Sequence, residues 1–90
     1  MRVTLICEDK PEALQIRLDN RAAHLAHIES SGVVEMAGPF LDTAGKMTGS
    51  LIVLEVGDLQ AAEAWAAADP YAKAGLFRSV MIREWKKVVG

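Results

Sequence analysis

The order of strand-like and helix-like segments constrains the fold of this chain more than any other feature. Short apolar segments and longer helical segments alternate along the 90 residues, with Gly, Pro and Asp residues between them. We expect strands at 3–7, 33–40, 50–56 and 77–85, helices at 11–30 and 59–68, and a turn of helix at 71–74. This βαββαβ order predicts an α+β fold of the ferredoxin-like type, a four-stranded antiparallel sheet with two helices on one face.

Local signals give the expected ends of the helices. Pro11 lies near the first position of the first helix, where proline is tolerated, and Gly32 ends that helix. Asp58 is a suitable N-cap for the second helix. The second helix ends before Pro70, because the residue that precedes a proline is disfavoured in the helical region.

Length and composition indicate one domain over residues 1–90 with an incompletely covered sheet. Apolar residues make up 51% of the chain, a large share for a domain too small to bury most of its surface. The two helices cover one sheet face, yet the third strand is apolar on both, with Leu51 and Val53 opposite Ile52 and Leu54. We therefore expect a homodimer that packs through the open sheet face.

Charge and composition argue against several classes of partner. With 10 Lys and Arg residues against 12 Asp and Glu, the formal charge is −2, so no basic surface is expected to hold nucleic acid. The central strands also lack the stacking aromatics of RNA-binding domains. No run approaches the ~20 apolar residues of a membrane span. The single Cys7 cannot form an internal disulfide, and we expect a cytoplasmic location.

The first helix combines an apolar stripe with basic residues. The stripe that we expect to face the sheet consists of Leu14, Leu18, Ala22, Leu25 and Ile28. This orientation places Arg21 inside the stripe, Arg17 and His24 on its shoulder, and His27 toward water. A buried Arg21 would need a carboxylate, or a cleft that holds water or an anionic ligand. Alternatively, Arg21 reaches solvent past the helix edge and His24 is an ordinary boundary residue.

Asp69, which precedes Pro70 and Tyr71, is the second candidate for chemistry. An Asp before a Pro is a common helix opening, with the carboxylate accepting a backbone N–H, and this role alone would explain the residue. Capping uses one carboxylate oxygen, so the other could orient a histidine. If the fold brings Asp69 to His24, the pair can move a proton near neutral pH.

The remaining patterns predict no metal and no cofactor. His24 and His27 have helical spacing, but no cysteine or third histidine completes a zinc set. The segment from Gly45 to Ser50 lacks the Lys-Ser/Thr of a phosphate-binding loop and precedes a strand. We interpret it as a hairpin loop.

Several separated motifs resemble those of the YciI-like family. They are Arg21-x-x-His24-Leu25, Ala37-Gly38-Pro39-Phe40, Gly49-Ser50, Asp69-Pro70-Tyr71 and Ala74-Gly75-Leu76-Phe77, with Trp85 near the end. The resemblance covers about the full chain and implies a subunit of a dimeric α+β barrel, similar to muconolactone isomerase. It also implies an active-site histidine and aspartate, at His24 and Asp69. One branch of the family acts as a dehydrochlorinase on chlorinated hydroxyquinols, and most members have no assigned substrate.

Residues and resemblance together predict a cofactor-independent lyase or isomerase for a small polar or aromatic molecule. His24 would take or deliver a proton, Asp69 would orient the imidazole, and Arg21 would hold a substrate anion or a developing oxyanion. The expected substrate-binding residues are Arg21, Gly38, Ser50 and Tyr71. The alternative is a non-catalytic module that binds a small ligand or a partner in the same cleft. Cofactor-free oxygenase chemistry, which shares the barrel architecture, stays open, and the sequence names no substrate.

Overall fold

The computed structural model describes residues 1–90 and has the predicted βαββαβ order. Its elements are β1 (Arg2–Asp9), α1 (Leu14–Ser31), β2 (Val34–Leu41), β3 (Met47–Glu55), α2 (Leu59–Ala68), α3 (Pro70–Lys73) and β4 (Phe77–Glu84). The four strands form one sheet in the order β2-β3-β1-β4, and every neighbouring pair is antiparallel. The predicted ferredoxin-like architecture is therefore confirmed. Strand β1 begins one residue earlier and ends two residues later than predicted, whereas β3 begins three residues earlier and ends one residue earlier.

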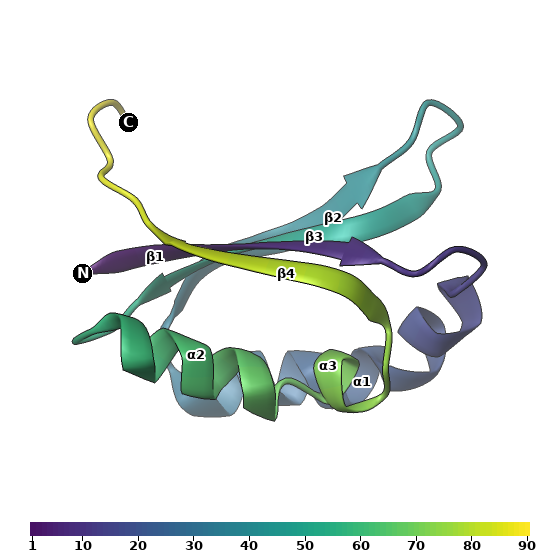
Figure 1. Cartoon of the computed structure of the whole chain (residues 1–90), viewed down its shortest axis with the longest axis horizontal. Helices are drawn as coiled ribbons and strands as arrows, with labels where there is room; N and C mark the ends of the chain where they lie inside the picture. The colour runs from purple at the N-terminus through teal and green to yellow at the C-terminus, as the bar shows by residue number, and fades with distance from the viewer.

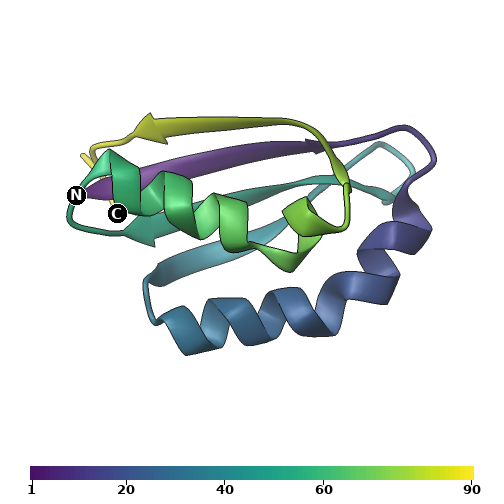
Figure 2. The ribbon, with the colours of Figure 1, turned by 60° about the horizontal axis from the view of Figure 1, so that its bottom comes forward.

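All three helices lie on one face of the sheet and leave the other face bare (Figure 1). Figure 2 shows that α1 runs along the side of β2, whereas α2 runs along the side of β1 and β4. The turn α3 follows α2 and contacts α1. Within this single helical layer, α1 therefore meets the second helical segment at α3. None of the three helices combines the length and apolar character that a membrane crossing requires.

The main core lies between the two central strands and α2. Antiparallel register pairs Leu5 with Ile52 and Val3 with Leu54, so these side chains point to the same sheet face. All four are at most 1% exposed, and Trp65 of α2 packs against them. Burying an apolar side chain of this size contributes about 1.5–3 kcal/mol. The core is therefore built largely without α1.

Local signals predicted the ends of α2 correctly. The Asp58 side chain accepts the backbone N–H of Ala61, as expected for an N-cap, and the helix ends at Ala68, before Asp69 and Pro70. Gly32 follows α1 with a left-handed φ of 66°, so the predicted stop of that helix is also confirmed.

The predicted start of α1 is wrong. Pro11 and Glu12 form a turn, and α1 begins only at Leu14. Glu12 has a φ of 57°, a left-handed backbone that cannot continue into a right-handed helix. The proline therefore shapes the loop between β1 and α1 and is not part of the helix.

The predicted orientation of α1 is also wrong. Its buried residues are Arg17 and His24, whereas Leu18 and Leu25 are 45% and 51% exposed. The α1 face that meets the rest of the chain carries buried Arg17 and His24, whose side chains find partners there, together with half-buried Ile16 and Ile28. Of the predicted stripe, Ile28 does pack against the main core. His27 does not point to water. Its ring is half-buried beside Trp65 of α2.

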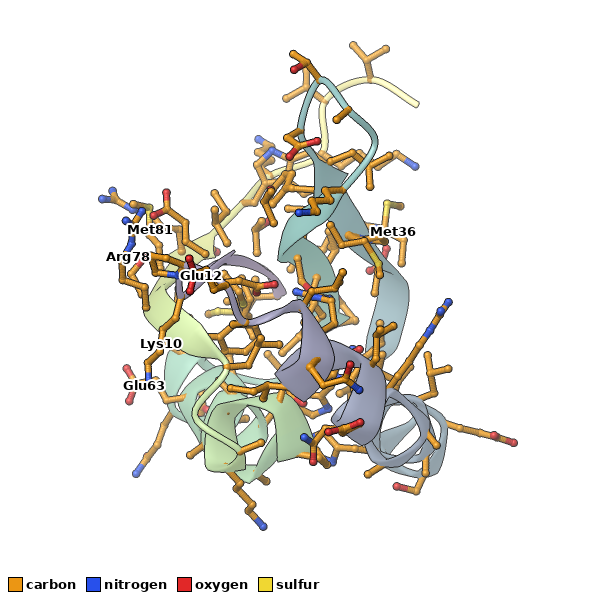
Figure 3. All side chains as sticks on the ribbon, turned by 90° about the vertical axis from the view of Figure 1, so that its right-hand side faces the viewer. Lys10, Glu12, Met36, Glu63, Arg78 and Met81 are labelled. Atoms are coloured by element: carbon orange, nitrogen blue, oxygen red, sulfur yellow. The ribbon has the colours of Figure 1, made fainter.

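The bare sheet face carries large apolar side chains. Ile6, Met36, Leu51, Met81 and Trp85 are each between 36% and 54% exposed. Figure 3 shows Met36 and Met81 on opposite sides of the molecule, in agreement with their places on the two edge strands. These residues leave an apolar surface across the sheet.

Candidate active site

A cavity of about 160 Å³ opens between α1 and β2, with α3 at its inner end. Its walls are formed by Arg17, Arg21, His24, Leu25, Ile28, Ala37, Gly38, Pro39, Met47 and Tyr71. Four of the six residues expected from the sequence, Arg21, His24, Gly38 and Tyr71, therefore line one cavity. The other two, Asp69 and Ser50, lie in a layer behind the walls, where each contacts a lining residue.

Asp69 holds His24 from behind the cavity. The His24 Nδ1 lies 2.7 Å from Asp69 Oδ1, and the two side chains are 7% and 2% exposed. Because a carboxylate only accepts hydrogen bonds, the proton of this bond belongs to Nδ1. The same oxygen, Oδ1, accepts the backbone N–H of Tyr71 at 3.0 Å. Asp69 is thus both the N-cap of α3 and the partner of the imidazole, and one oxygen serves both roles.

The second nitrogen of His24 is available to a ligand. Nε2 has no hydrogen-bond partner within the chain. Every fully buried side-chain nitrogen and oxygen of the structure does have a partner, so Nε2 is not among the fully buried atoms. Nε2 therefore reaches solvent, through the cavity that His24 lines. In the neutral ring, with Nδ1 protonated, Nε2 carries the lone pair that can accept a proton.

Tyr71 is clamped by the two buried residues of α1. Its ring stacks on His24 with centroids 3.9 Å apart, and the Arg17 Cζ lies 4.8 Å from the centroid of the same ring. Residues seven apart are separated by about 10.5 Å along a helix, so the tyrosine fills the interval between them. Burial raises the pKa of the Tyr71 hydroxyl, and this outweighs the opposite effect of the Arg17 and Arg21 charges. The hydroxyl therefore stays protonated and can donate a hydrogen bond.

Arg17 is the residue whose role in the site was not predicted. It binds Asp9 of β1 through two hydrogen bonds of 2.8 Å and donates a third, of 2.9 Å, to Ser50 Oγ. Burial alone would lower the pKa of Arg17, but the hydrogen bonds and the charge of Asp9 raise it. The spacing of seven residues places Arg17 and His24 on one face of α1, but it does not identify Asp9 or Ser50 as the partners that give Arg17 its role.

Of the two predicted substrate-binding residues Ser50 and Gly38, only Gly38 lines the cavity. Ser50 is 3% exposed, does not line the cavity, and accepts the hydrogen bond of Arg17. It supports the wall and does not reach a ligand directly. Gly38 lines the cavity from β2, and no atom lies within 4 Å of the position that a Cβ would occupy there. Gly38 pairs with Leu51, so a side chain at this position would point to the bare face of the sheet, and Gly38 borders the cavity through its backbone.

Arg21 brings the one charge of the cavity wall that has no partner. It is exposed, lines the cavity, and takes part in none of the salt bridges of the chain. Arg17, by contrast, is neutralised by Asp9. The alternative in which Arg21 reaches solvent thus agrees with the structure, and so does the expectation that it borders a cleft.

His27 has a separate, structural contact. Its Nε2 lies 3.1 Å from the backbone oxygen of Trp65, and the two rings are 4.4 Å apart. Because a carbonyl oxygen accepts, Nε2 of His27 is the donor. The two histidines of α1 thus bind different partners, and no cluster of three or more His, Cys, Asp or Glu side chains is arranged to hold a metal ion.

Comparison with known proteins gives full-length matches. The family model described as the YCII-related domain matches residues 1–86. Protein YciI of Escherichia coli is 38% identical over 97 residues, covering 98% of this chain and 99% of that protein. The 5-chloro-2-hydroxyhydroquinone dehydrochlorinase TftG of Burkholderia phenoliruptrix AC1100 was solved in complex with 2,5-dihydroxybenzoquinone. It superposes with a TM-score of 0.88 at 34% identity, over 96% of this chain and 94% of that chain.

A more distant match concerns the fold alone. An antibiotic biosynthesis monooxygenase superposes with a TM-score of 0.56 at 16% identity, over 96% of this chain and 98% of that one. This likeness confirms the α+β architecture.

Proposed function

The chain belongs to the YCII-related domain family, and from this premise we propose that it is an enzyme for a small organic molecule in which His24 transfers a proton. The observation that carries the proposal is the 2.7 Å contact of His24 Nδ1 with buried Asp69, which leaves Nε2 as the free nitrogen in the cavity. A positioned acid–base group of this kind accelerates a reaction by ~10²–10⁴.

The proposed reaction is an elimination or an isomerisation without a cofactor. His24 Nε2 removes a proton from the ligand, Asp69 keeps the ring oriented, and Arg21 stabilises the negative charge that develops. The Tyr71 hydroxyl donates a hydrogen bond to a substrate oxygen. A dehydrochlorinase such as TftG removes a proton and a chloride ion, which is chemistry that a base and a cation can support.

The proposal also assigns a role to the bare sheet face. We propose that a second copy of the chain packs there, because exposed Ile6, Leu51 and Trp85 form an apolar surface opposite the helices. The cavity lies on the helical side of the sheet and stays open in such a homodimer.

The first experiment is a thermal-shift screen of small carboxylates and phenols, with 2,5-dihydroxybenzoquinone among them, followed by turnover assays of the hits. Chloride release from 5-chloro-2-hydroxyhydroquinone is the first assay, because TftG acts on that compound. We expect His24→Ala and Asp69→Asn to lose turnover while they remain folded. His27→Gln is the matched control, because His27 lies on the same helix outside the cavity.

The outcomes separate an enzyme from a binding module. Turnover that survives in His24→Ala would contradict the proposed base. If ligands bind the wild type but are never converted, and His24→Ala changes only their affinity, the chain is a non-catalytic binding module that uses the same cavity.

A further inference from the structure

A second hollow lies next to the cavity of the candidate active site. It measures about 220 Å³ and is lined by residues 9–14 and 46–48. These residues belong to the loop that joins β1 to α1 and to the hairpin that joins β2 to β3, which lie at the same end of the sheet (Figure 1). Met47 is the one residue that lines both the second hollow and the cavity. The two spaces are therefore neighbours that meet at Met47.

A β-bulge turns Met47 toward the cavity. The register between β2 and β3 shifts after Phe40, which leaves Thr48 of β3 without a partner in β2. In a regular strand Met47 and Leu51, four residues apart, would both point to the bare face of the sheet. The extra residue reverses the alternation, and Met47 lines the cavity on the helical side instead.

The partition between the two spaces consists of Met47 and the ion pair of Arg17 and Asp9. Arg17 lines the cavity, Asp9 lines the second hollow, and two hydrogen bonds of 2.8 Å join them. Both side chains are buried, so separating them would leave each charge without a partner. Met47 is half-buried and has an unbranched side chain that repacks easily. It is therefore the part of the partition that can open.

The second hollow is more polar than the cavity. Its lining includes Lys10, Glu12 and Lys46, and none of the three takes part in a salt bridge of the chain. Because Asp9 is already neutralised by Arg17, two lysines stand against one glutamate, and these charges favour a carboxylate. A ligand that fills both spaces thus has a compact head in the cavity and a polar tail in the second hollow.

We propose that the second hollow is a subsite of the candidate active site, and that Met47 determines whether a ligand reaches it. The substrate is then an elongated acid, with a head that meets His24 and a flexible chain that passes Met47 and ends in a carboxylate beside Lys10 and Lys46. This inference rests on the proposed function and names a specificity-determining residue of the same site.

The test measures binding by isothermal titration calorimetry for two compounds that differ only in the tail. They are 2,5-dihydroxybenzoquinone and its derivative with a 4-carboxybutyl chain on ring carbon 3. We expect the wild type to bind the tailed compound at least about tenfold more tightly, because each methylene group that becomes buried is worth a factor of about four.

Variants at Met47 show whether this side chain controls entry to the second hollow. Met47→Ile replaces it with a stiff, β-branched side chain that keeps the partition closed, so the advantage of the tail should be lost while the parent compound still binds. Met47→Ala removes most of the side chain and should keep the advantage. Met36→Ile is the matched control, because Met36 lies on the bare face and lines neither space.

The inference would be overturned if neither compound bound, or if the wild type bound both alike. It would also be overturned if the advantage of the tail survived in Met47→Ile, or disappeared in Met47→Ala or in Met36→Ile. Failure here is distinct from failure of the proposed function, because binding is measured without turnover. A chain that converts a substrate through His24, yet gains nothing from the tail, would refute the subsite and leave proton transfer by His24 standing.

Discussion

At the scale of single residues, the buried pair of Arg17 and Asp9 fixes the inner wall of the cavity. Arg17 connects β1, through Asp9, with Ser50 of β3 and the ring of Tyr71. Removing one member of a buried ion pair leaves the other charge without a partner, which typically costs about 3–5 kcal/mol.

We therefore predict that Arg17→Met lowers the free energy of unfolding by about 3–5 kcal/mol, measured by urea denaturation. Arg17→Met combined with Asp9→Leu should recover much of this loss, because no isolated charge remains. A single variant within about 0.5 kcal/mol of wild type, the range of ordinary surface changes, would contradict the structural role.

Cys7 is a residue whose chemistry the fold suppresses. Burial, and then the nearby negative charge of Asp69, raise the pKa of its thiol from 9.0 to about 12. We predict that a thiol reagent at pH 8 modifies Cys7 only after the chain is unfolded by urea, because the thiolate is the reactive form. Rapid modification of the folded chain would contradict this prediction.

The same shift has a consequence for stability against pH. The folded chain holds the thiol proton more tightly than the unfolded chain. The contribution of Cys7 to the free energy of unfolding is therefore full below pH 9.0 and is lost as the pH rises toward 12. The urea midpoint should therefore fall over this range, and it should fall less in Cys7→Ala.

At the scale of elements, α1 and α2 show what local sequence can and cannot predict. The bounds of α2 follow from Asp58 and Pro70, whose effects act within a few residues, and the structure confirms them. The orientation of α1 depends instead on distant partners. Asp9, Ser50 and Asp69 accept hydrogen bonds from Arg17 and His24, and no periodicity within the helix contains that information.

The family motifs supplied part of what periodicity missed. They pointed to His24 and Asp69, two residues 45 apart in sequence that the structure places in contact. They did not give Arg17 a role, because its importance comes from Asp9 and Tyr71 and not from a motif of its own.

The exposed leucines of α1 give a test of this orientation. Leu18 is 45% exposed, so we predict that Leu18→Ala changes the free energy of unfolding by less than about 1 kcal/mol. Had the leucine stripe faced the sheet, as its periodicity predicts, the same change would cost about 2–5 kcal/mol. Urea denaturation distinguishes the two values, and Ile52→Ala in the core is the control for a buried position.

At the scale of the whole molecule, the sheet separates two surfaces with different uses. The helical side holds the cavity, and the opposite side exposes apolar residues of all four strands. We predict that the chain sediments at micromolar concentration as a dimer, with twice its mass of 9.7 kDa.

Leu51→Lys, near the middle of the bare face, should give a folded monomer, because an unpaired charge would then be buried in the interface. Lys73→Glu on the helical side is the control and should leave the dimer intact. A wild type that is monomeric under these conditions would contradict the proposed interface.

The central claim is that Asp69 fixes the His24 ring so that Nε2 is the free base in the cavity. Nitrogen-15 NMR of the histidine rings tests it most directly, because it reports which ring nitrogen carries the proton. We predict that neutral His24 is protonated on Nδ1, that its Nε2 resonance moves when 2,5-dihydroxybenzoquinone is added, and that Asp69→Asn removes the preference for this tautomer. A His24 ring protonated on Nε2 in the wild type, and indifferent to the ligand, would contradict the claim.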